Sequence, residues 1–203
     1  MDYVLIVLLA YILGSSNMAF YLAKLKKVDI RSSGSGNLGT SNATILLGWG
    51  SGVAVGAHDI GKGVLAVVLA KLFFPELEYA GAAAGVACVL GHIFPFYLKF
   101  KGGKGFAPYI GMTLAMSWKF ALVVIALIIG ITLITDYLVL GTFTTITIVP
   151  VWMGIASQNY ILALILLIAT TVIFIKHREN FTRLRNGTEI GLRSTAKGEH
   201  KVK

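Results

Sequence analysis

The sequence predicts an all-α integral membrane protein, and both its composition and its apolar segments support that class. Hydrophobic residues make up 56% of the 203-residue chain and charged residues only 13%, with a mean hydropathy of +0.79. Such a chain has too few ions to cover a soluble globule with a polar surface. Because a spanning helix needs about 20 apolar residues, we expect about seven transmembrane helices in a single membrane domain, residues 1–192. The polar stretch 193–203 is expected to be a disordered tail.

Seven apolar segments separated by polar loops define the expected spans. The first carries Asp2 where a leader would be basic, and it stays apolar for too long to be a cleaved signal. The fourth segment is the shortest and would not cross about 30 Å of hydrocarbon upright. The segments lie at residues 3–23, 47–74, 79–98, 106–117, 119–135, 138–155 and 160–176.

The charge distribution predicts the orientation of these spans. The chain has 18 Lys and Arg against 9 Asp and Glu, a formal net charge of +9. In a membrane protein such cations record insertion topology and contact with anionic lipids, so nucleic acid is not an expected partner. If every segment crosses, 15 of the 18 cations fall on one side, in loops 24–31 and 99–104 and in the tail from Lys176. The positive-inside tendency then places the N-terminus outside and the C-terminus in the cytoplasm.

A polar, glycine-rich stretch follows the first span. Between Ser32 and Asn42 every residue except Leu38 is Gly, Ser, Thr or Asn. Glycine lets the backbone approach a ligand, and N–H groups before a helix suit anions, so this stretch is a candidate phosphate cradle. An ordinary flexible loop is the alternative. The candidate binding residues are Ser35, Gly36, Asn37, Ser41 and Asn42.

The loop "KFKGGKGFAP", residues 99–108, concentrates lysine and glycine after an aromatic run. Lys99 and Lys101 are expected mainly to reach lipid phosphates at the membrane surface. Lys104 is surrounded by glycines that have no reason to face lipid, so it is predicted to bind a substrate phosphate beside Gly102 and Gly103.

Some ionisable residues lie well inside the predicted spans, where burial of charge is costly. Asp59 and Lys62 are one helical turn apart in "HDIGKG" and are expected to form an ion pair facing the protein interior. His92, near the end of the third segment, is either a packing residue or a functional one.

A third polar stretch, "KHRENFTRLRNGTEIG", follows the last span. At helical spacing His177 and Asn180 share a face, with Arg183 next to them. This face is expected to complete a polar site at the membrane surface. The alternative is an interfacial amphipathic helix with basic flanks.

The residue inventory is rich in phosphate-binding groups and poor in nucleophiles. The chain has no Gly-x-Ser-x-Gly motif, no metal-ligand spacing such as His-Glu-x-x-His, and no His-x-x-x-x-Asp acyltransferase dyad. We therefore expect no metal and no cofactor, and a site that works by positioning and electrostatic stabilisation. A lipid phosphotransferase or phosphatase and an anion transporter or channel are the rival functions.

Four stretches, "GSGNLGTSN", "DIGKG", "GHIFPFYLKFKGGKG" and "HRENFTRLRNGTE", resemble in order and spacing the signature motifs of the bacterial acyl-phosphate:glycerol-3-phosphate acyltransferases, the PlsY family. The resemblance covers residues 14–191. It implies a seven-span enzyme of the bacterial inner membrane with its active site toward the cytoplasm. The implied reaction moves a fatty acyl group from acyl phosphate to the 1-hydroxyl of glycerol 3-phosphate, giving lysophosphatidic acid and phosphate. Membrane lipids and an acyl-phosphate-forming enzyme are the implied partners.

The resemblance also implies roles for individual residues. Donors in the two glycine-rich loops would hold the acyl phosphate, and the cationic groups near the last span would hold glycerol 3-phosphate. The implied catalytic set is Lys104, His177, Asn180 and Asp59, with substrate contacts at Ser35, Gly36, Asn37, Ser41, Asn42, Lys62, His92, Gly102, Gly103, Lys104, Thr142, Arg183 and Glu189.

The chain departs from the family pattern in three places. The motifs also do not identify which group acts as the general base. Ile45 replaces an arginine, Pro108 replaces a threonine, and Gly191 replaces a lysine. His177 and Asp59 are candidate bases by residue type, and the substrate's own phosphate is the alternative proton acceptor.

Overall fold

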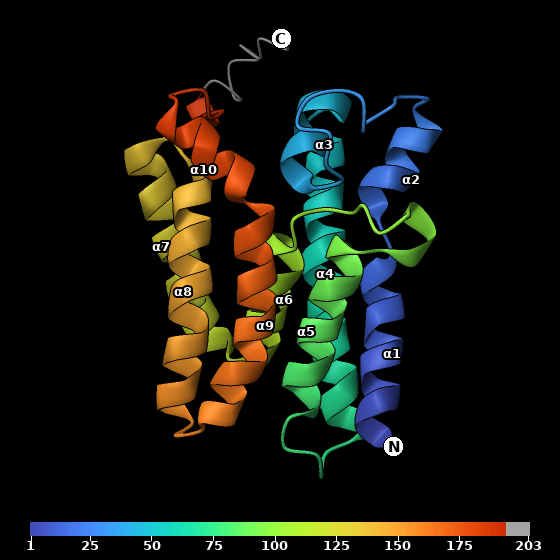
Figure 1. The fold of residues 1–203 in the computed structure, drawn as a ribbon, viewed down its shortest axis with the longest axis vertical. Coiled ribbons are helices and arrows are strands. Elements are labelled where there is room, and N and C mark those ends of the chain that lie inside the picture. The colour runs from blue at the N-terminus through green and yellow to red at the C-terminus, as the bar shows by residue number, and fades with distance from the viewer. Residues whose placement is uncertain (194–203) are drawn as a thin grey trace. The chain divides into compact units, whose positions relative to one another are not determined.

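The computed structural model describes residues 1–193, and all regular structure in that range is helical (Figure 1). The predicted all-α class is therefore confirmed for the described residues. The chain divides into two compact units, residues 1–117 and the residues from 118 onward, which are described in turn. Apart from Arg193, the predicted tail lies outside the described residues.

In the first unit, α1, α4 and α5 run alongside one another, and α6 packs against α4 (Figure 1). Two short elements, α3 and the 3-10 helix η1, lie within the polar stretches that connect the longer helices. The helices are α1 (Asp2–Ser15), α2 (Met18–Leu25), α3 (Thr40–Leu47), α4 (Trp49–Phe73), α5 (Ala80–Ile93), η1 (Phe96–Leu98) and α6 (Phe106–Met116).

The predicted first span is broken into α1 and α2 at Ser16 and Asn17. Asn17 leaves the helical region, with φ −136° and ψ 99°, and its side chain accepts a hydrogen bond from the Phe20 N–H at 2.9 Å. Asn side chains compete with helical hydrogen bonds in this way and favour helix starts. Asn17 is only 1% exposed, so the break lies inside the protein.

The long helices of the first unit approach one another at glycines. A Cβ at Gly14 of α1 would overlap backbone atoms of α5, and a Cβ at Gly91 of α5 would overlap backbone atoms of α1. Helices α4 and α6 meet in the same way at Gly63 and Gly111. Small residues at such crossings let membrane helices pack backbone to backbone.

Up to residue 193, the second unit contains three long helices and one short one. They are α7 (Trp118–Thr135), α8 (Leu138–Ala156), α9 (Tyr160–Lys176) and α10 (Arg178–Arg185). The Phe120 and Trp152 rings stack with their centroids 3.8 Å apart, joining α7 to α8. Helices α9 and α10 are bent by 47° relative to each other at His177.

Each of the seven predicted apolar segments contains a helix. Among the described residues, five helical stretches are long and apolar enough to cross a membrane, or six if the bent pair α9 and α10 forms one span. Helix α6, with 11 residues, is shorter than that limit. The stretches are Asp2–Leu25, Trp49–Phe73, Ala80–Leu98, Trp118–Thr135 and Leu138–Ala156.

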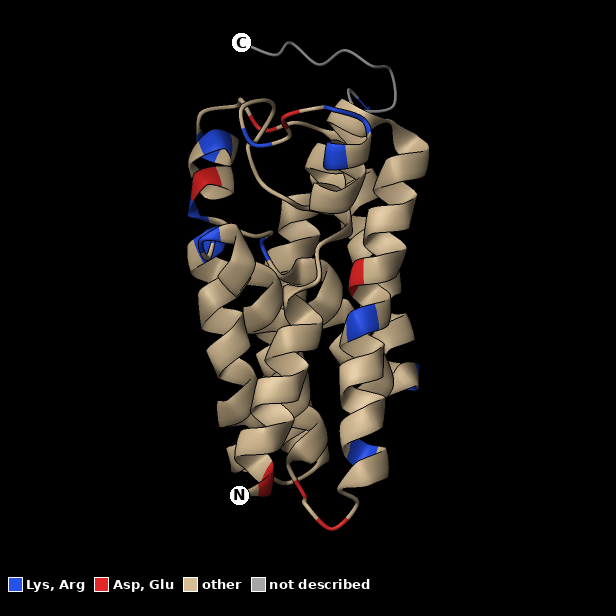
Figure 2. Cartoon of the chain, turned by 90° about the vertical axis from the view of Figure 1, so that its right-hand side faces the viewer, with Lys and Arg blue, Asp and Glu red and all other residues tan. Residues whose placement is uncertain are grey.

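Basic residues predominate at one end of the first unit, where Asp29 also lies, and Lys71 lies in the last turn of α4 toward the other end. Figure 2 shows Lys and Arg gathered around α2 at one end, and acidic residues in the loop between α4 and α5 at the other. That loop contains Glu76 and Glu78. Asp59 and Lys62 lie in the middle of α4.

Candidate functional site

The glycine-rich stretch of the first unit is an ordered loop wrapped around the buried side chain of Asn42. The Asn42 Oδ1 atom accepts a hydrogen bond from the Ser35 N–H at 2.9 Å. Its Nδ2 donates to the carbonyls of Ile30 and Asn37 at 3.0 Å each, and Asn42 is fully buried. Asn42 therefore organises the loop through these internal hydrogen bonds, and its direct contact with substrate stays a prediction.

Other polar groups of this loop remain near the surface. Ser35, Gly36 and Ser41 are exposed, and Asn37 is half-buried. Asn37 donates to the Ser35 hydroxyl at 2.7 Å and accepts from the Gly39 N–H at 2.9 Å. Gly36 has φ +66°, a backbone conformation that favours glycine. The loop thus presents a hydroxyl and polar backbone to the surface, as an anion site requires.

A cluster of ionisable side chains is buried between α4, α5 and the break in the first span. The Lys62 ammonium lies 2.9 Å from Asp59 Oδ1, so the predicted ion pair is confirmed. The same ammonium donates to the Ser16 carbonyl at 2.7 Å and to His92 Nδ1 at 2.9 Å. His58 lies 3.2 Å from Asp59 Oδ1 through Nδ1 and 3.0 Å from Ser16 Oγ through Nε2.

Within this cluster Asp59 is buried and engaged by other side chains of the protein. Asp59 is 1% exposed, and its Oδ1 atom faces Lys62 and two histidines. A general base must reach the proton that it removes. In this structure the Asp59 carboxylate is engaged inside the cluster, and its catalytic role stays a prediction. Lys62 and His92 are 4% and 2% exposed, and their substrate contacts also stay predictions.

The loop that carries Lys104 is fixed to the end of α5. The Gly102 N–H donates to the Ile93 carbonyl at 3.0 Å, and the Gly103 N–H donates to the His92 carbonyl at 3.2 Å. A Cβ at Gly103 would overlap His92 Nε2. The two glycines thus pack closely on α5 with their N–H groups bonded to its carbonyls, and their contact with phosphate stays a prediction. Lys104 itself is half-buried.

The two glycine-rich loops lie against each other. The position of a Cβ on Gly103 would be 3.1 Å from the Leu38 carbonyl oxygen. Arg31 spans the same junction, because its guanidinium donates to the carbonyls of Leu98 at 3.4 Å and Lys101 at 3.2 Å. The structure therefore brings the Ser35 loop and the Lys104 loop together within the first unit.

The other lysines of the second loop lie on an exposed turn. Lys99 and Phe100 have φ +55° and +58°, and Lys99, Phe100 and Lys101 are exposed. This exposure agrees with the predicted location of Lys99 and Lys101 at the membrane surface.

In the second unit, the predicted polar face after the last span is present. His177, 6% exposed, joins α9 to α10 and has Nδ1 2.9 Å from the Ile173 carbonyl. Asn180 donates to Glu189 Oε1 at 2.6 Å, and Arg183 Nε donates to Glu189 Oε2 at 2.8 Å. Glu189 therefore orients Asn180 and Arg183, and its two oxygens are engaged by them.

Thr142 of α8 is directed back toward its own helix. Its hydroxyl donates to the Leu138 carbonyl at 3.2 Å, and the residue is 2% exposed. This common back-bond of helical threonine satisfies the hydroxyl locally. The structure offers no support for the predicted substrate contact of Thr142.

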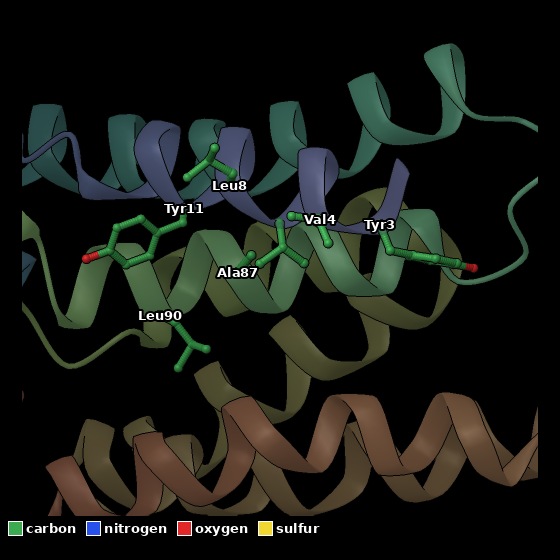
Figure 3. A pocket seen from close by; sticks show the side chains of 7 residues that line it. Tyr3, Val4, Leu8, Tyr11, Ala87 and Leu90 are labelled. Atoms are coloured by element: carbon green, nitrogen blue, oxygen red, sulfur yellow. The ribbon is translucent and has the colours of Figure 1, made fainter. Parts of the chain in front are cut away.

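An apolar cavity of about 500 Å³ lies between α1 and α5 (Figure 3). Its lining contains no charged side chain, so its chemistry suits an aliphatic chain and not a phosphate. Tyr11 stands at one end and donates through its hydroxyl to the Phe94 carbonyl at 2.6 Å. The lining residues are Tyr3, Val4, Val7, Leu8, Tyr11, Ala87 and Leu90.

Comparison with known proteins identifies the family that shares these loops and helices. Residues 4–187 match the family described as glycerol-3-phosphate acyltransferase. The chain belongs to this family. Glycerol-3-phosphate acyltransferases from Geobacter sulfurreducens and Coxiella burnetii (strain CbuG_Q212) are each 38% identical to it. The aligned regions cover 89% and 93% of this chain, and 92% and 97% of those proteins.

Two solved structures of the acyltransferase PlsY (YgiH), an integral membrane protein, share the fold. Its glycerol 3-phosphate form is 33% identical with a TM-score of 0.90, over 97% of this chain and 98% of that chain. Its lysophosphatidic acid form is 34% identical with a TM-score of 0.85, over 94% and 95%. This acyltransferase is therefore a multi-pass membrane protein.

The structure accounts for two of the three departures from the acyltransferase pattern. A Cβ at Gly191 would overlap the Asp136 carboxylate, so a lysine there requires that side chain to move. Pro108 lies in the first turn of α6, where a missing N–H costs no helical hydrogen bond. Nothing in the structure explains Ile45, which is half-buried on α3.

Sequence reasoning missed three residues that build the first-unit site of this acyltransferase. Ser16, Asn17 and His58 all contact the buried cluster or the glycine-rich loop. Ser16 and Asn17 are polar residues within an apolar segment, and this interruption is the sequence feature that could have indicated their role. Among the described residues, no group of three or more His, Cys, Asp or Glu side chains is arranged to hold a metal ion.

Proposed function

We propose that the chain transfers a fatty acyl group from acyl phosphate to the 1-hydroxyl of glycerol 3-phosphate, giving lysophosphatidic acid and inorganic phosphate. Membership of the glycerol-3-phosphate acyltransferase family supports the acceptor. The observation that carries the proposal is the contact between the Ser35 loop and the Lys104 loop at Gly103. It sets a cation beside a polar loop, an arrangement suited to a substrate with a phosphate leaving group.

In the proposed reaction the 1-hydroxyl oxygen attacks the acyl carbonyl carbon. A new C–O bond forms, the bond from the acyl carbon to the phosphate oxygen breaks, and phosphate leaves with the electron pair. Lys104 and the Ser35 hydroxyl would stabilise the negative charge that develops on phosphate. The hydroxyl proton passes to the substrate phosphate, because Asp59 is buried in its own cluster. His177 is the alternative proton acceptor.

Glycerol 3-phosphate is proposed to bind the polar face of α10. Arg183 supplies a cation and Asn180 supplies an amide, and both are oriented by Glu189. Arg suits phosphate because its planar group presents several donors in a fixed arrangement.

We propose that all seven helical segments cross the bacterial inner membrane, with the N-terminus outside and the site facing the cytoplasm. The distribution of 15 of 18 cations to one side supports this topology. The 11-residue α6 would have to cross where the bilayer or the protein shortens the path.

Incubation of the purified protein with palmitoyl phosphate and glycerol 3-phosphate tests the proposal. We expect phosphate and lysophosphatidic acid to appear in equal amounts, and the absence of product above the protein-free rate contradicts the proposal. A parallel reaction with palmitoyl-CoA tests the identity of the donor. Product formed only with palmitoyl-CoA would support acyltransferase activity but contradict acyl phosphate as the donor. Lys104→Met is expected to lower kcat by about 10²-fold or more, with Lys104→Arg as the charge-retaining control.

A further inference from the structure

We infer that Asp59, Lys62 and His92 form a positioning assembly that holds the Lys104 loop against the glycine-rich loop, and that none of the three touches the substrate. The inference rests on the proposed function, because it assigns this assembly to the placement of Lys104. It explains why charged groups are kept inside a membrane helix, where they are costly.

Lys62 is the centre of the assembly. Its ammonium has three donors, and the structure gives it three acceptors: Asp59 Oδ1 at 2.9 Å, the Ser16 carbonyl at 2.7 Å and His92 Nδ1 at 2.9 Å. These acceptors come from α4, from the break in the first span and from α5. A single side chain thus ties three elements together.

His92 connects Lys62 to the Lys104 loop. The Nδ1 side of the ring faces the Lys62 ammonium at 2.9 Å, which leaves the Nε2 side directed toward the loop. The Nε2 side of the ring packs against Gly103, and the His92 carbonyl accepts the Gly103 N–H at 3.2 Å. Both the ring and the backbone of His92 therefore fix the residue that precedes Lys104.

The break in the first span connects Lys62 to the glycine-rich loop. Lys62 holds the Ser16 carbonyl, and the next residue, Asn17, donates through Nδ2 to the Leu38 carbonyl at 3.3 Å. Leu38 in turn lies against Gly103. These contacts form a continuous ring that starts and ends at Lys62 and passes through both loops. Displacement of Lys62 would therefore affect the position of both loops.

The buried charges of the assembly serve to position the two loops and not to stabilise the fold. Replacing a buried ion pair with well-packed apolar residues is often neutral or stabilising, whereas removing one partner leaves an uncompensated charge. An apolar side chain at position 62 would not hold the Ser16 carbonyl, which has left the helical hydrogen-bond pattern. The Asp59 carboxylate offsets the positive charge of the Lys62 ammonium that holds this carbonyl.

The double variant Asp59→Asn/Lys62→Met separates positioning from stability. We expect the thermal midpoint to fall in each single variant and to recover in part in the double variant. We expect kcat to stay about 10²-fold below wild type in the double variant, because a displaced catalytic group costs about that much. The matched control is Lys71→Met, a second lysine of α4 that donates to the Ala115 carbonyl outside the cluster; its kcat should stay within about twofold of wild type.

Two readouts exclude a catalytic or a merely structural role. The kcat of Asp59→Asn should fall by a similar factor across the pH range, whereas a lost catalytic base would abolish one limb of the profile. Hydrogen exchange without substrate should accelerate at the Ser35, Gly102 and Gly103 amides in Lys62→Met and stay unchanged in α7, α8 and α9.

The inference is overturned if the folded double variant keeps kcat within about threefold of wild type, or if exchange at those three amides is unchanged. A wild-type protein inactive with acyl phosphate contradicts the proposed donor and not the assembly, because exchange is measured without substrate.

Discussion

The buried side chain of Asn42 accepts a hydrogen bond from the Ser35 N–H at 2.9 Å, so a side chain seven residues away shapes the candidate phosphate loop. Asn42→Ala removes this acceptor and the donors to the Ile30 and Asn37 carbonyls. We expect a loss of stability of about 1–3 kcal/mol and a higher KM for acyl phosphate. Ser32→Ala, at an exposed position of the same stretch, is the control. Equal melting temperatures and KM values for the two variants would contradict the role of Asn42.

Gly103 is expected to tolerate no side chain. A Cβ there would overlap the His92 ring, so Gly103→Ala must displace either the ring or the Lys104 loop. We predict a fall in kcat of about 10²-fold, since small displacements of catalytic groups have effects of that size. Gly61→Ala is the matched control because a Cβ at Gly61 has open space around it. Steady-state kinetics of both variants check the prediction, and wild-type kcat in Gly103→Ala would refute it.

Glu189 is expected to act through the two residues that it orients. Glu189→Ala removes the partners of Asn180 Nδ2 and Arg183 Nε. Because hydrogen bonds to charged groups contribute about 1.5–3 kcal/mol, we expect KM for glycerol 3-phosphate to rise by about tenfold or more. Glu179→Gln, at an exposed position of α10, should leave KM unchanged. A titration of glycerol 3-phosphate at saturating donor distinguishes the two variants.

His177 tests where the hydroxyl proton goes. If the substrate phosphate accepts it, His177→Gln should raise KM for glycerol 3-phosphate and keep a measurable kcat with a normal acidic limb. A fall in kcat of about 10³-fold with unchanged KM and no acidic limb would instead identify His177 as the base. The pH–rate profile of the variant decides between these outcomes.

Gly191→Lys, which restores the family residue, is predicted to destabilise the second unit. The new Cβ would overlap the Asp136 carboxylate. That carboxylate accepts the Arg193 N–H at 2.9 Å, and the Asp136 carbonyl accepts the Leu192 N–H at 2.8 Å. We expect a lower melting temperature and no gain in activity. A more active variant with wild-type stability would show that the loop adapts easily.

The sequence was sufficient for the helical segments because each is a local run of apolar residues. The contacts that build the site are not local. Lys62 and Ser16 are 46 residues apart, and no periodicity indicates that the Ser16 carbonyl has an acceptor role. The motif containing Gly102 and Gly103 is visible in the sequence, but nothing in the sequence indicates that Gly103 packs against the His92 ring. The ion pair of Asp59 and Lys62 was predictable because one helical turn separates them.

The break at Ser16 and Asn17 constrains the order in which the helices of the first unit pack during membrane insertion. During synthesis the first span reaches the bilayer before α4, which carries the partner of the Ser16 carbonyl. An unsatisfied backbone group in hydrocarbon costs several kcal/mol, so the break in this segment gains its full stability only when α4 supplies the donor. Its final placement must therefore wait for the arrival of α4, so the insertion of these helices is a cooperative event rather than a series of independent ones.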